Sequence, residues 1–397
     1  MSQTDSSASQ APLVIVGSGL AGYHVAREVR QRDAERPIML VTQDSGDFYS
    51  KPLLSTAVAK QQTPEVLVQK TAGEMAAELN LIVRTSTRVE SIDRVQRTLV
   101  IGHERQPWSQ LVLATGAEPI RLPLAGSESV LLHSVNDLDD YRCFRNKLKP
   151  GDRVAVLGAG LVGVEFAHDL SQGGYPVDLV APEAHLLPRL IPAPVAAPLE
   201  QALAEQGVRF HLGYSAEDAQ ATANGVTLGL CRGGGELNVQ HLLGATGLKP
   251  RIRLAQAAGL HCERGICVDR QLRTSDPDIF ALGDCAEIEG LNLMYVQPLM
   301  ASARILAQVL TAMSSDVDES PSLHLQALPI LVKTAICPIV AALPPAGVDG
   351  RWHFETLEQG VIGCYTDTRD TLQGFALSGQ AVRKKAQLTR QLPPLLA

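Results

Sequence analysis

Apolar positions along the chain fall twice into one local pattern, in which a short apolar run is followed by a glycine-rich turn and a stretch of helical spacing. The apolar runs are residues 13–16 and 154–157, and the helical patterns follow at 23–32 and 164–170. This order predicts a β-strand, a tight turn and an α-helix each time. The turns have the sequences Gly17-Ser18-Gly19-Leu20-Ala21-Gly22 and Gly158-Ala159-Gly160-Leu161-Val162-Gly163.

The three glycines of each turn have different physical roles. The first allows a tight bend, the second lets the backbone approach a pyrophosphate, and the third lets the helix pack close to the strand. A pyrophosphate at this place meets unpaired N–H groups and the positive end of the helix dipole. We therefore predict a dinucleotide site at each turn, because glycines that only bend the chain explain one such turn better than two. The predicted glycines are Gly17, Gly19, Gly22, Gly158, Gly160 and Gly163.

Two more apolar strands end in residues that suit such sites. One ends in Thr115 and Gly116, and another ends in Gly283 and Asp284. Open α/β sheets bind ligands at the carboxyl ends of their strands. A carboxylate there can accept a hydrogen bond from a sugar hydroxyl; the alternative is an aspartate that caps the next helix.

An internal repeat sets the domain organisation. The Ala-Thr-Gly turn at 114–116 recurs at 245–247 and ends in Gly247, which marks where a second nucleotide unit enters and leaves the first. The predicted domains are 12–117 with 251–326 for the first nucleotide, 118–250 for the second, 327–397 for a small C-terminal domain, and 1–11 for a flexible tail.

Composition narrows the class of protein. Of 397 residues, 45% are hydrophobic and 19% charged, and this balance is typical of packed globular domains. The net charge of −7 argues against nucleic-acid binding. The most apolar stretch, 299–313, is interrupted by Ser302, Arg304 and Gln308 and predicts an amphipathic helix, not a membrane span. We expect a cytoplasmic protein without integral membrane insertion, and the sequence leaves its oligomeric state open.

The seven cysteines exclude one electron route. They form no C-x-x-C pair, and none precedes Cys143. Two-dinucleotide flavoenzymes that reduce disulfides place a redox cysteine soon after the first glycine turn. Electrons must therefore leave by another route, and no metal ligands are predicted.

The second nucleotide is expected to be NADH. A strand at 177–180 ends shortly before Glu183. A carboxylate there can accept a bond from a ribose 2′-hydroxyl and repel a 2′-phosphate. The alternative is a solvated surface glutamate.

Several segments together resemble a known family. The two glycine turns, Tyr49-Ser50-Lys51-Pro52, both Ala-Thr-Gly turns and residues 274–284 are similar to pyridine-nucleotide flavoprotein reductases of the ferredoxin-reductase type. Segments 50–55, 291–300 and 332–338 most resemble the branch that serves rubredoxin. The resemblance covers nearly the whole chain after Pro12. It implies an α/β fold with two Rossmann-like domains in a glutathione-reductase-like arrangement and a small α+β C-terminal domain.

The resemblance also assigns cofactors and residues. It implies a tightly but non-covalently bound FAD at the first turn and NADH as the substrate at the second. By similarity, Leu20 and Ala21 flank the FAD pyrophosphate, Val89 lies near the adenine, and Asp284 and Val296 approach the ribitol and flavin. Lys333 arrives from the C-terminal domain.

The chain departs from the family at the FAD ribose. Such flavoproteins usually end their second strand with a glutamate. Here the positions are Thr42, Gln43 and Asp44, and the sequence leaves open which of them binds the ribose.

Two charged residues are predicted to act in catalysis. Lys51 follows the second strand, and Glu165 stands just after the second glycine turn. In the resembling reductases these positions form an ion pair near the flavin and nicotinamide, where a cation stabilises negative charge on the reduced flavin. The alternative is an exposed lysine and a glutamate favoured by the helix dipole.

The implied function is a reductase that passes a hydride from NADH to FAD and then single electrons to rubredoxin, for alkane hydroxylation. One alternative is an NADH-dependent reductase of a [2Fe–2S] ferredoxin in an oxygenase system. Another, of a different class, is a flavin-bearing scaffold whose nucleotide state controls binding.

Overall fold

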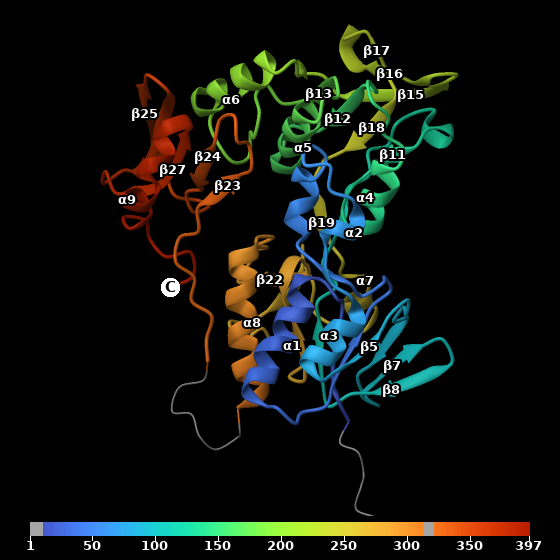
Figure 1. The fold of residues 1–397 in the computed structure, drawn as a ribbon. Helices are drawn as coiled ribbons and strands as arrows, with labels where there is room; N and C mark the ends of the chain where they lie inside the picture. The colour runs from blue at the N-terminus through green and yellow to red at the C-terminus, as the bar shows by residue number, and fades with distance from the viewer. Residues whose placement is uncertain (1–10, 313–320) are drawn as a thin grey trace, which may run out of the picture. The chain divides into compact units, whose positions relative to one another are not determined.

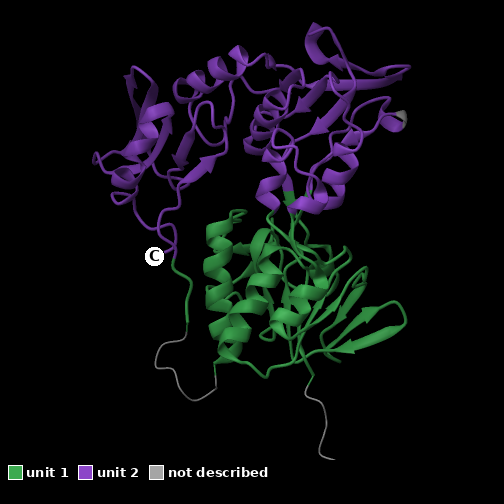
Figure 2. Ribbon diagram, viewed as in Figure 1, with its two compact units in different colours: residues 1–50, 68–118, 249–324 green, residues 51–67, 119–248, 325–397 purple. Residues whose placement is uncertain are grey.

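The computed structural model describes residues 11–312 and 321–397, which divide into two compact units (Figures 1 and 2). The first unit contains residues up to 50, 68–118 and 249–324, and the second contains 51–67, 119–248 and 325–397. The tail predicted at 1–11 lies outside the described residues except for Ala11.

A five-stranded parallel sheet forms the centre of the first unit, in the order β21-β9-β1-β2-β5. Strands β1 and β2 are completely buried, and near-continuous apolar runs of this kind are typical of parallel strands covered on both faces. The strands are β1 (Leu13–Val16), β2 (Ile38–Val41), β5 (Ile82–Arg84), β9 (Gln110–Leu113) and β21 (Ile279–Ala281).

Helices α1 and α8 lie side by side in this unit (Figure 1). Helix α1 begins directly after Gly19 and has two basic residues, Arg30 and Arg32, in its last turn, where they suit the negative end of its dipole. The remaining elements are α1 (Leu20–Arg32), β3 (Phe48–Tyr49), β4 (Val68–Lys70), α3 (Ala72–Leu79), β6 (Ser91–Asp93), β7 (Thr98–Ile101), β8 (Glu104–Pro107), α7 (Arg253–Ala257), β20 (Ile266–Val268), η4 (Gly283–Cys285), β22 (Ala286–Ile288) and α8 (Val296–Thr311).

The second unit repeats this design with a parallel sheet in the order β11-β18-β12-β13-β14. The central strands β12 and β13 are again buried throughout. The elements of the sheet and its surroundings are η1 (Lys51–Thr56), α2 (Pro64–Leu67), η2 (Ser127–Ser129), β11 (Leu132–His133), α4 (Leu138–Arg145), β12 (Val154–Leu157), α5 (Leu161–Gln172), β13 (Val177–Ala181), α6 (Ala193–Glu205), β14 (Arg209–Leu212) and β18 (His241–Gly244). Strands β10 (Ala117–Pro119) and β19 (Leu248–Pro250) stand at the boundaries where the chain enters and leaves this unit.

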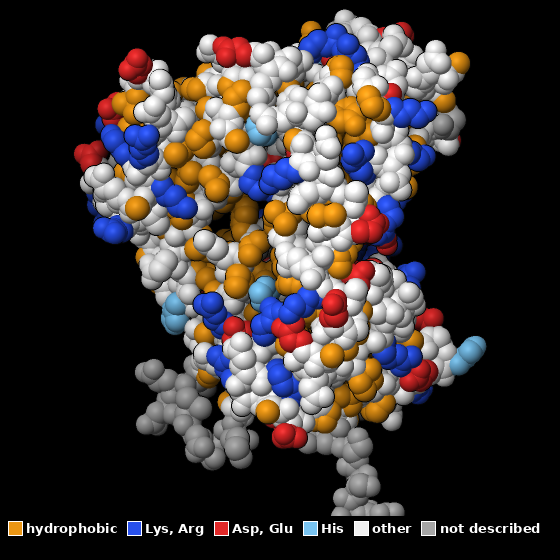
Figure 3. Space-filling model, in the orientation of Figure 1, with side chains coloured by type: hydrophobic (Ala, Val, Ile, Leu, Met, Phe, Trp, Pro, Cys, Tyr) orange, Lys and Arg blue, Asp and Glu red, His pale blue; other side chains and the backbone are white. Residues whose placement is uncertain are grey.

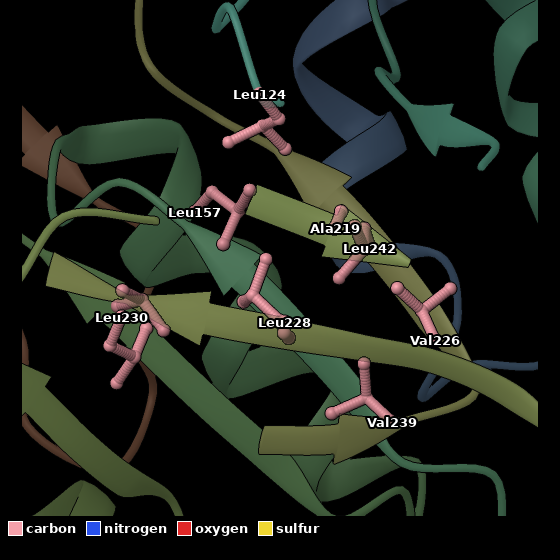
Figure 4. Packing of buried hydrophobic residues seen from close by; sticks show 10 residues of the cluster. Leu124, Leu157, Ala219, Val226, Leu228, Leu230, Val239 and Leu242 are labelled. Carbon is pink, nitrogen blue, oxygen red and sulfur yellow. The ribbon is translucent and has the colours of Figure 1, made fainter. Parts of the chain in front are cut away.

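A small antiparallel sheet packs on the parallel sheet of the second unit (Figure 4). Alternate residues of its central strand, Val226, Leu228 and Leu230, face Leu157 and Leu242 of the parallel sheet, as the two-residue period of a strand requires. Each fully buried side chain of this size contributes about 1.5–3 kcal/mol. The added elements are β15 (Ala216–Thr222), β16 (Gly225–Leu230), η3 (Cys231–Gly233) and β17 (Glu236–Val239).

The C-terminal part is a five-stranded antiparallel sheet in the order β23-β24-β27-β26-β25. Its core joins Val340, Ile362, Phe375 and Leu377 to Leu388 of the last helix. The elements are β23 (Ile330–Val332), β24 (Ile339–Ala342), β25 (Gly350–Leu357), β26 (Gly360–Asp367), β27 (Leu372–Ser378), η5 (Gly379–Lys384) and α9 (Lys385–Thr389). The predicted fold class, two parallel α/β sheets and a small α+β part, is confirmed. The predicted domain boundaries stay a prediction.

The last two features of the fold are the distribution of surface charge and the length of the helices. Basic and acidic side chains are interspersed over the face shown in Figure 3. Within 11–312 and 321–397, none of the helices has the length and apolar character needed to cross a membrane.

Candidate functional site

The first glycine turn has a backbone that only glycine fits at two positions. Gly17 has φ +116°, and a Cβ there would lie 2.2 Å from the Ala114 carbonyl oxygen. A Cβ on Gly22 would lie 1.9 Å from the Gly17 oxygen. At Gly19, in contrast, a Cβ would meet no described atom within 4 Å. The middle glycine therefore leaves room at the start of α1, as close approach of a phosphate requires.

The second turn has the same three properties. Gly158 has φ +121° and its Cβ would lie 2.5 Å from the Ala245 oxygen, while a Cβ on Gly163 would lie 2.0 Å from the Gly158 oxygen. A Cβ on Gly160 again meets nothing within 4 Å among the described residues. The residues present therefore fit two dinucleotides, one at each turn.

Equivalent hydrogen bonds relate the second strands of the two sheets. The first glycine of each turn donates its N–H to the neighbouring strand, to Val41 O at 2.9 Å in the first unit and to Val180 O at 2.8 Å in the second. Asp44 lies three residues after Val41, and Glu183 lies three residues after Val180. Asp44 and Glu183 are therefore structural counterparts.

The next bonds along the chain support this correspondence. Ser86 N donates to the Asp44 carbonyl at 2.9 Å, and Gly213 N donates to the Glu183 carbonyl at 3.0 Å. Both donors follow the last strand of their own parallel sheet, β5 or β14. The two units thus share equivalent backbone hydrogen bonds up to the residue that carries the carboxylate.

A hydrogen-bond network holds Asp44 against the first glycine turn. Its Oδ1 accepts from Ser18 Oγ at 2.8 Å, from Thr42 Oγ1 at 2.6 Å and from Gly46 N at 2.9 Å. Thr42 is buried and also accepts from Ser18 Oγ at 3.0 Å, whereas Gln43 and Asp44 are both exposed. Of the three candidates left open by the sequence, Asp44 offers a carboxylate beside the turn, and Thr42 supports it.

Both Ala-Thr-Gly turns are held by their threonines. Thr115 Oγ1 donates to Arg251 O at 2.8 Å, and Thr246 Oγ1 donates to Ile120 O at 2.7 Å. These bonds fix the turns whose alanine carbonyls touch the first glycines. Gly116 and Gly247 follow with φ +69° and +112°, respectively, which glycine adopts without strain.

Asp284 lies next to the start of α1. The preceding Gly283 has φ +75°, and a Cβ on it would lie 2.9 Å from the Ala21 Cβ. Asn292 Nδ2 donates to Asp284 O at 3.2 Å and to Ala286 O at 2.7 Å, so these two bonds also hold the short helix η4. The fold therefore brings Asp284 to the first glycine turn from a distant part of the sequence.

Two further predicted residues also lie in the first unit. Val89 comes two residues after Thr87, whose N–H donates to the Thr42 carbonyl at 2.8 Å, so it follows a segment held at the end of β2. Val296 is the first residue of α8, and its side chain is 36% exposed.

Glu165 is a buried carboxylate with a complete set of partners. It is 1% exposed, and it accepts from Ser55 Oγ at 2.6 Å, Lys333 Nζ at 2.7 Å and Lys333 N at 3.0 Å. Lys333 Nζ also donates to Ser55 Oγ at 2.9 Å and to Pro52 O. A buried charge requires pairing and hydrogen bonds of this kind. Three distant segments of the second unit meet at this carboxylate.

Lys51 has a different hydrogen-bond partner. It donates to Asn136 Oδ1 at 2.7 Å, and Asn136 N donates to Asp140 Oδ2 at 3.0 Å. The Lys51–Glu165 pair implied by the resemblance stays a prediction, whereas Lys333 is an observed ion-pair partner of Glu165. Sequence reasoning gave Ser55 no role; the signal for it was its place in segment 50–55, four residues after Lys51.

A second buried carboxylate lies one helical turn further along α5. Asp169 accepts from Val58 N at 2.8 Å and Ala59 N at 3.1 Å, and burial raises its pKa. Together, Glu165 and Asp169 hold residues 51–59 on this helix.

Two known protein families match consecutive parts of the chain. Residues 11–315 match the family described as pyridine nucleotide-disulphide oxidoreductase. Residues 322–392 match a family described as rubredoxin binding C-terminal domain.

Known proteins match over nearly the whole chain. The rubredoxin-NAD(+) reductase of Alcanivorax borkumensis is 40% identical over 97% of this chain and 99% of its own length. The enzyme of the same name from Acinetobacter baylyi is 38% identical over 97% and 98%. Among solved structures, the covalent complex of putidaredoxin reductase with putidaredoxin matches with a TM-score of 0.85 at 26% identity, covering 96% of this chain and 94% of that one.

Proposed function

The chain belongs to the pyridine nucleotide-disulphide oxidoreductase family, and on this premise we propose that it is an FAD-dependent reductase that oxidises NADH and delivers electrons to rubredoxin. The observation that carries the proposal is the pair of equivalent turns, each with an open glycine at the start of a helix. The choice of acceptor is supported by the match of residues 322–392 and by the two rubredoxin-NAD(+) reductases.

The first unit would hold FAD tightly and without a covalent bond. Gly17, Gly19 and Gly22 shape the place for the pyrophosphate, Asp44 accepts from the adenosine ribose, and Asp284 approaches the ribitol. When bound, FAD supplies hydride acceptance from NADH and the release of electrons one at a time. Because Asp44 Oδ1 already accepts three bonds, we assign the ribose contact to its other oxygen, Oδ2.

The second unit would hold NADH. Gly158, Gly160 and Gly163 form the corresponding turn, and Glu183 stands where Asp44 stands in the first unit. A carboxylate at this position accepts from a ribose 2′-hydroxyl and repels a 2′-phosphate, which supports NADH over NADPH.

Lys51 would place a positive charge near the flavin, and Glu165 would position its surroundings. Glu165 binds both the side chain and the backbone N–H of Lys333, so it holds this second cation at a set place. It also holds Ser55 of η1, the element that begins with Lys51. A fixed positive charge favours negative charge on a reduced flavin without reorganisation.

Steady-state kinetics with purified protein tests the proposal. We expect NADH-dependent reduction of rubredoxin with a kcat/KM at least about tenfold above that with a [2Fe–2S] ferredoxin, a difference of about 1.4 kcal/mol. Lys51→Ala should slow flavin reduction by NADH, while the exposed Lys60→Ala on the same segment serves as its matched control.

Each alternative has its own outcome. A higher kcat/KM with ferredoxin than with rubredoxin would show that ferredoxin is the acceptor, and the protein would still be an NADH-dependent reductase. Slow NADH oxidation with every electron acceptor would contradict the proposed enzymatic function and favour a scaffold whose nucleotide state controls binding. A role in alkane hydroxylation and a cytoplasmic location remain part of the proposal; the seven free cysteines agree with a reducing compartment.

A further inference from the structure

Residues 261–267 form a tight hairpin in the first unit, outside the predicted dinucleotide site. Cys267 N donates to His261 O at 3.1 Å, and Glu263 N donates to Gly265 O at 3.0 Å across the tip. An antiparallel bridge pairs Cys262 with Ile266. His261 N donates to Ser275 Oγ at 3.0 Å, which holds the start of the hairpin. The backbone here is therefore well fixed by hydrogen bonds.

This hairpin brings three different metal-ligating side chains to one side. His261 and Glu263 are two residues apart on one arm, and Cys267 lies across from His261 on the other. The pairing places the three side chains on the same face. Their ligand atoms all lie within 4.8 Å of one another, with His261 Nε2 at 3.8 Å from Glu263 Oε1. Small rotations of two exposed side chains would close this group around an ion.

The surroundings of Cys267 carry excess negative charge. It pairs with Glu287 of β22, which is 2% exposed and accepts from Gly265 N at 2.7 Å. Burial is the largest cause that raises the pKa of Cys267; a backbone hydrogen bond from Glu263 lowers this pKa, and the negative charges of Glu287 and Glu263 raise it. Arg264, a cation near Glu287, has its Nη2 3.7 Å from the carboxylate and a side chain that is 73% exposed. A divalent cation would offset this charge and favour the thiolate.

We propose that His261, Glu263 and Cys267 form a binding site for Zn²⁺. The mixture of imidazole, carboxylate and thiolate suits zinc, whereas magnesium and calcium prefer oxygen ligands alone. Three protein ligands leave the fourth tetrahedral position to water. Binding releases the Cys267 thiol proton to solvent, so the affinity for zinc rises with pH. The ion would bridge both arms of the hairpin and stabilise the start of β20.

Titration of the flavin-containing protein, without an affinity tag, tests this site. After dialysis against a chelator, Zn²⁺ is added in competition with a chromogenic chelator. Co²⁺ is added in a second series and followed by its visible d–d absorption at wavelengths longer than those of flavin. We expect one equivalent to bind, with tetrahedral Co²⁺ absorption. His261→Gln, Glu263→Gln and Cys267→Ser should each weaken binding by at least about tenfold.

Matched controls come from another histidine and another cysteine. His103→Gln and Cys143→Ser change exposed residues elsewhere and should bind zinc like the unmodified protein. His261 is 65% exposed, so His261→Gln is expected to fold even if Cys267→Ser does not. Equal zinc affinity in the unmodified protein and His261→Gln would overturn the proposal. Because the readout is metal bound and not NADH oxidised, the result is independent of the proposed function.

Discussion

The two glycine turns have the same backbone but different helices after them. From the first glycine to the residue Asp44 or Glu183, the two units share equivalent backbone hydrogen bonds. Two residues after the third glycine they diverge: α1 has His24, whose pKa burial lowers, and α5 has the buried Glu165. The repeated backbone is what the two predicted pyrophosphate sites have in common. The differing residue reflects what each helix packs against, because α5 contacts η1 and holds Lys333.

Blocking the open glycine of each turn should separate the two predicted nucleotides. Gly19→Val should yield protein without flavin, whereas Gly160→Val should stay yellow and lose NADH oxidation. Neither side chain meets a described atom at its Cβ, so both variants should fold. Flavin absorbance, NADH kinetics and thermal unfolding measure this. Loss of flavin from Gly160→Val but not from Gly19→Val would reverse the assignment.

Removing the Glu165 side chain from α5 should lower the free energy of unfolding much more than removing its counterpart, the His24 side chain, from α1. Glu165→Ala leaves Lys333 and Ser55 without their shared acceptor and should lower the free energy of unfolding by about 3 kcal/mol. It should also slow flavin reduction by NADH in stopped-flow experiments. His24→Ala is the matched control and should cost less than about 1 kcal/mol. Equal losses for the two variants would show that the Glu165 network contributes little.

Acid should destabilise the second unit through a histidine that the first unit lacks at the same place. Strand register makes His133 the counterpart of Phe280, and burial lowers the pKa of His133 to about 4. In the unfolded chain this pKa is about 6.5, so the unfolded state binds more protons as pH falls from 6.5 to 4. At pH 5 the loss is about 2 kcal/mol relative to pH 8.

His133→Phe copies the residue of the first sheet and should remove this part of the acid sensitivity. Denaturant titrations of both proteins at pH 5 and 8 measure it. The idea fails if the difference in unfolding free energy between the two pH values is the same with phenylalanine.

The smallest expected effect comes from changing Asp44 or Glu183, the corresponding carboxylates of the two units. Glu183→Gln should raise KM for NADH by about tenfold, which is about 1.4 kcal/mol, and reduce the preference over NADPH. Asp44→Asn should weaken FAD retention by a similar factor and leave KM for NADH unchanged. Equilibrium dialysis of FAD and kinetics with both nucleotides check the pair. An effect of Asp44→Asn on NADH instead of FAD would contradict the correspondence.

The turns themselves were predictable because their signals are local. Gly17 and Gly158 require glycine for reasons contained in a strand, a turn and the next helix. The resemblance to flavoprotein reductases added the small C-terminal domain and the acceptor branch, and the family match supports both. The choice among Thr42, Gln43 and Asp44 stayed open because it depends on the register of β2 against β1.

Interactions between segments that are distant in the sequence could not be predicted from it. Lys333 is 168 residues from Glu165, and no spacing in the sequence connects them. The group His261, Glu263 and Cys267 lies within seven residues, but its use as a ligand set depends on the hairpin pairing that turns all three to one face.

The sequence by itself determined two strand-turn-helix units, their glycine positions and the absence of an early redox cysteine, because these depend on neighbouring residues. Tertiary structure alone decided that Asp44 corresponds to Glu183, that Lys333 and Ser55 meet at Glu165, and that three possible zinc ligands share one face. These features depend on strand register and on packing between segments that are distant in the sequence. A buried charged group such as Glu165 is stable only when another segment supplies its ion-pair and hydrogen-bond partners.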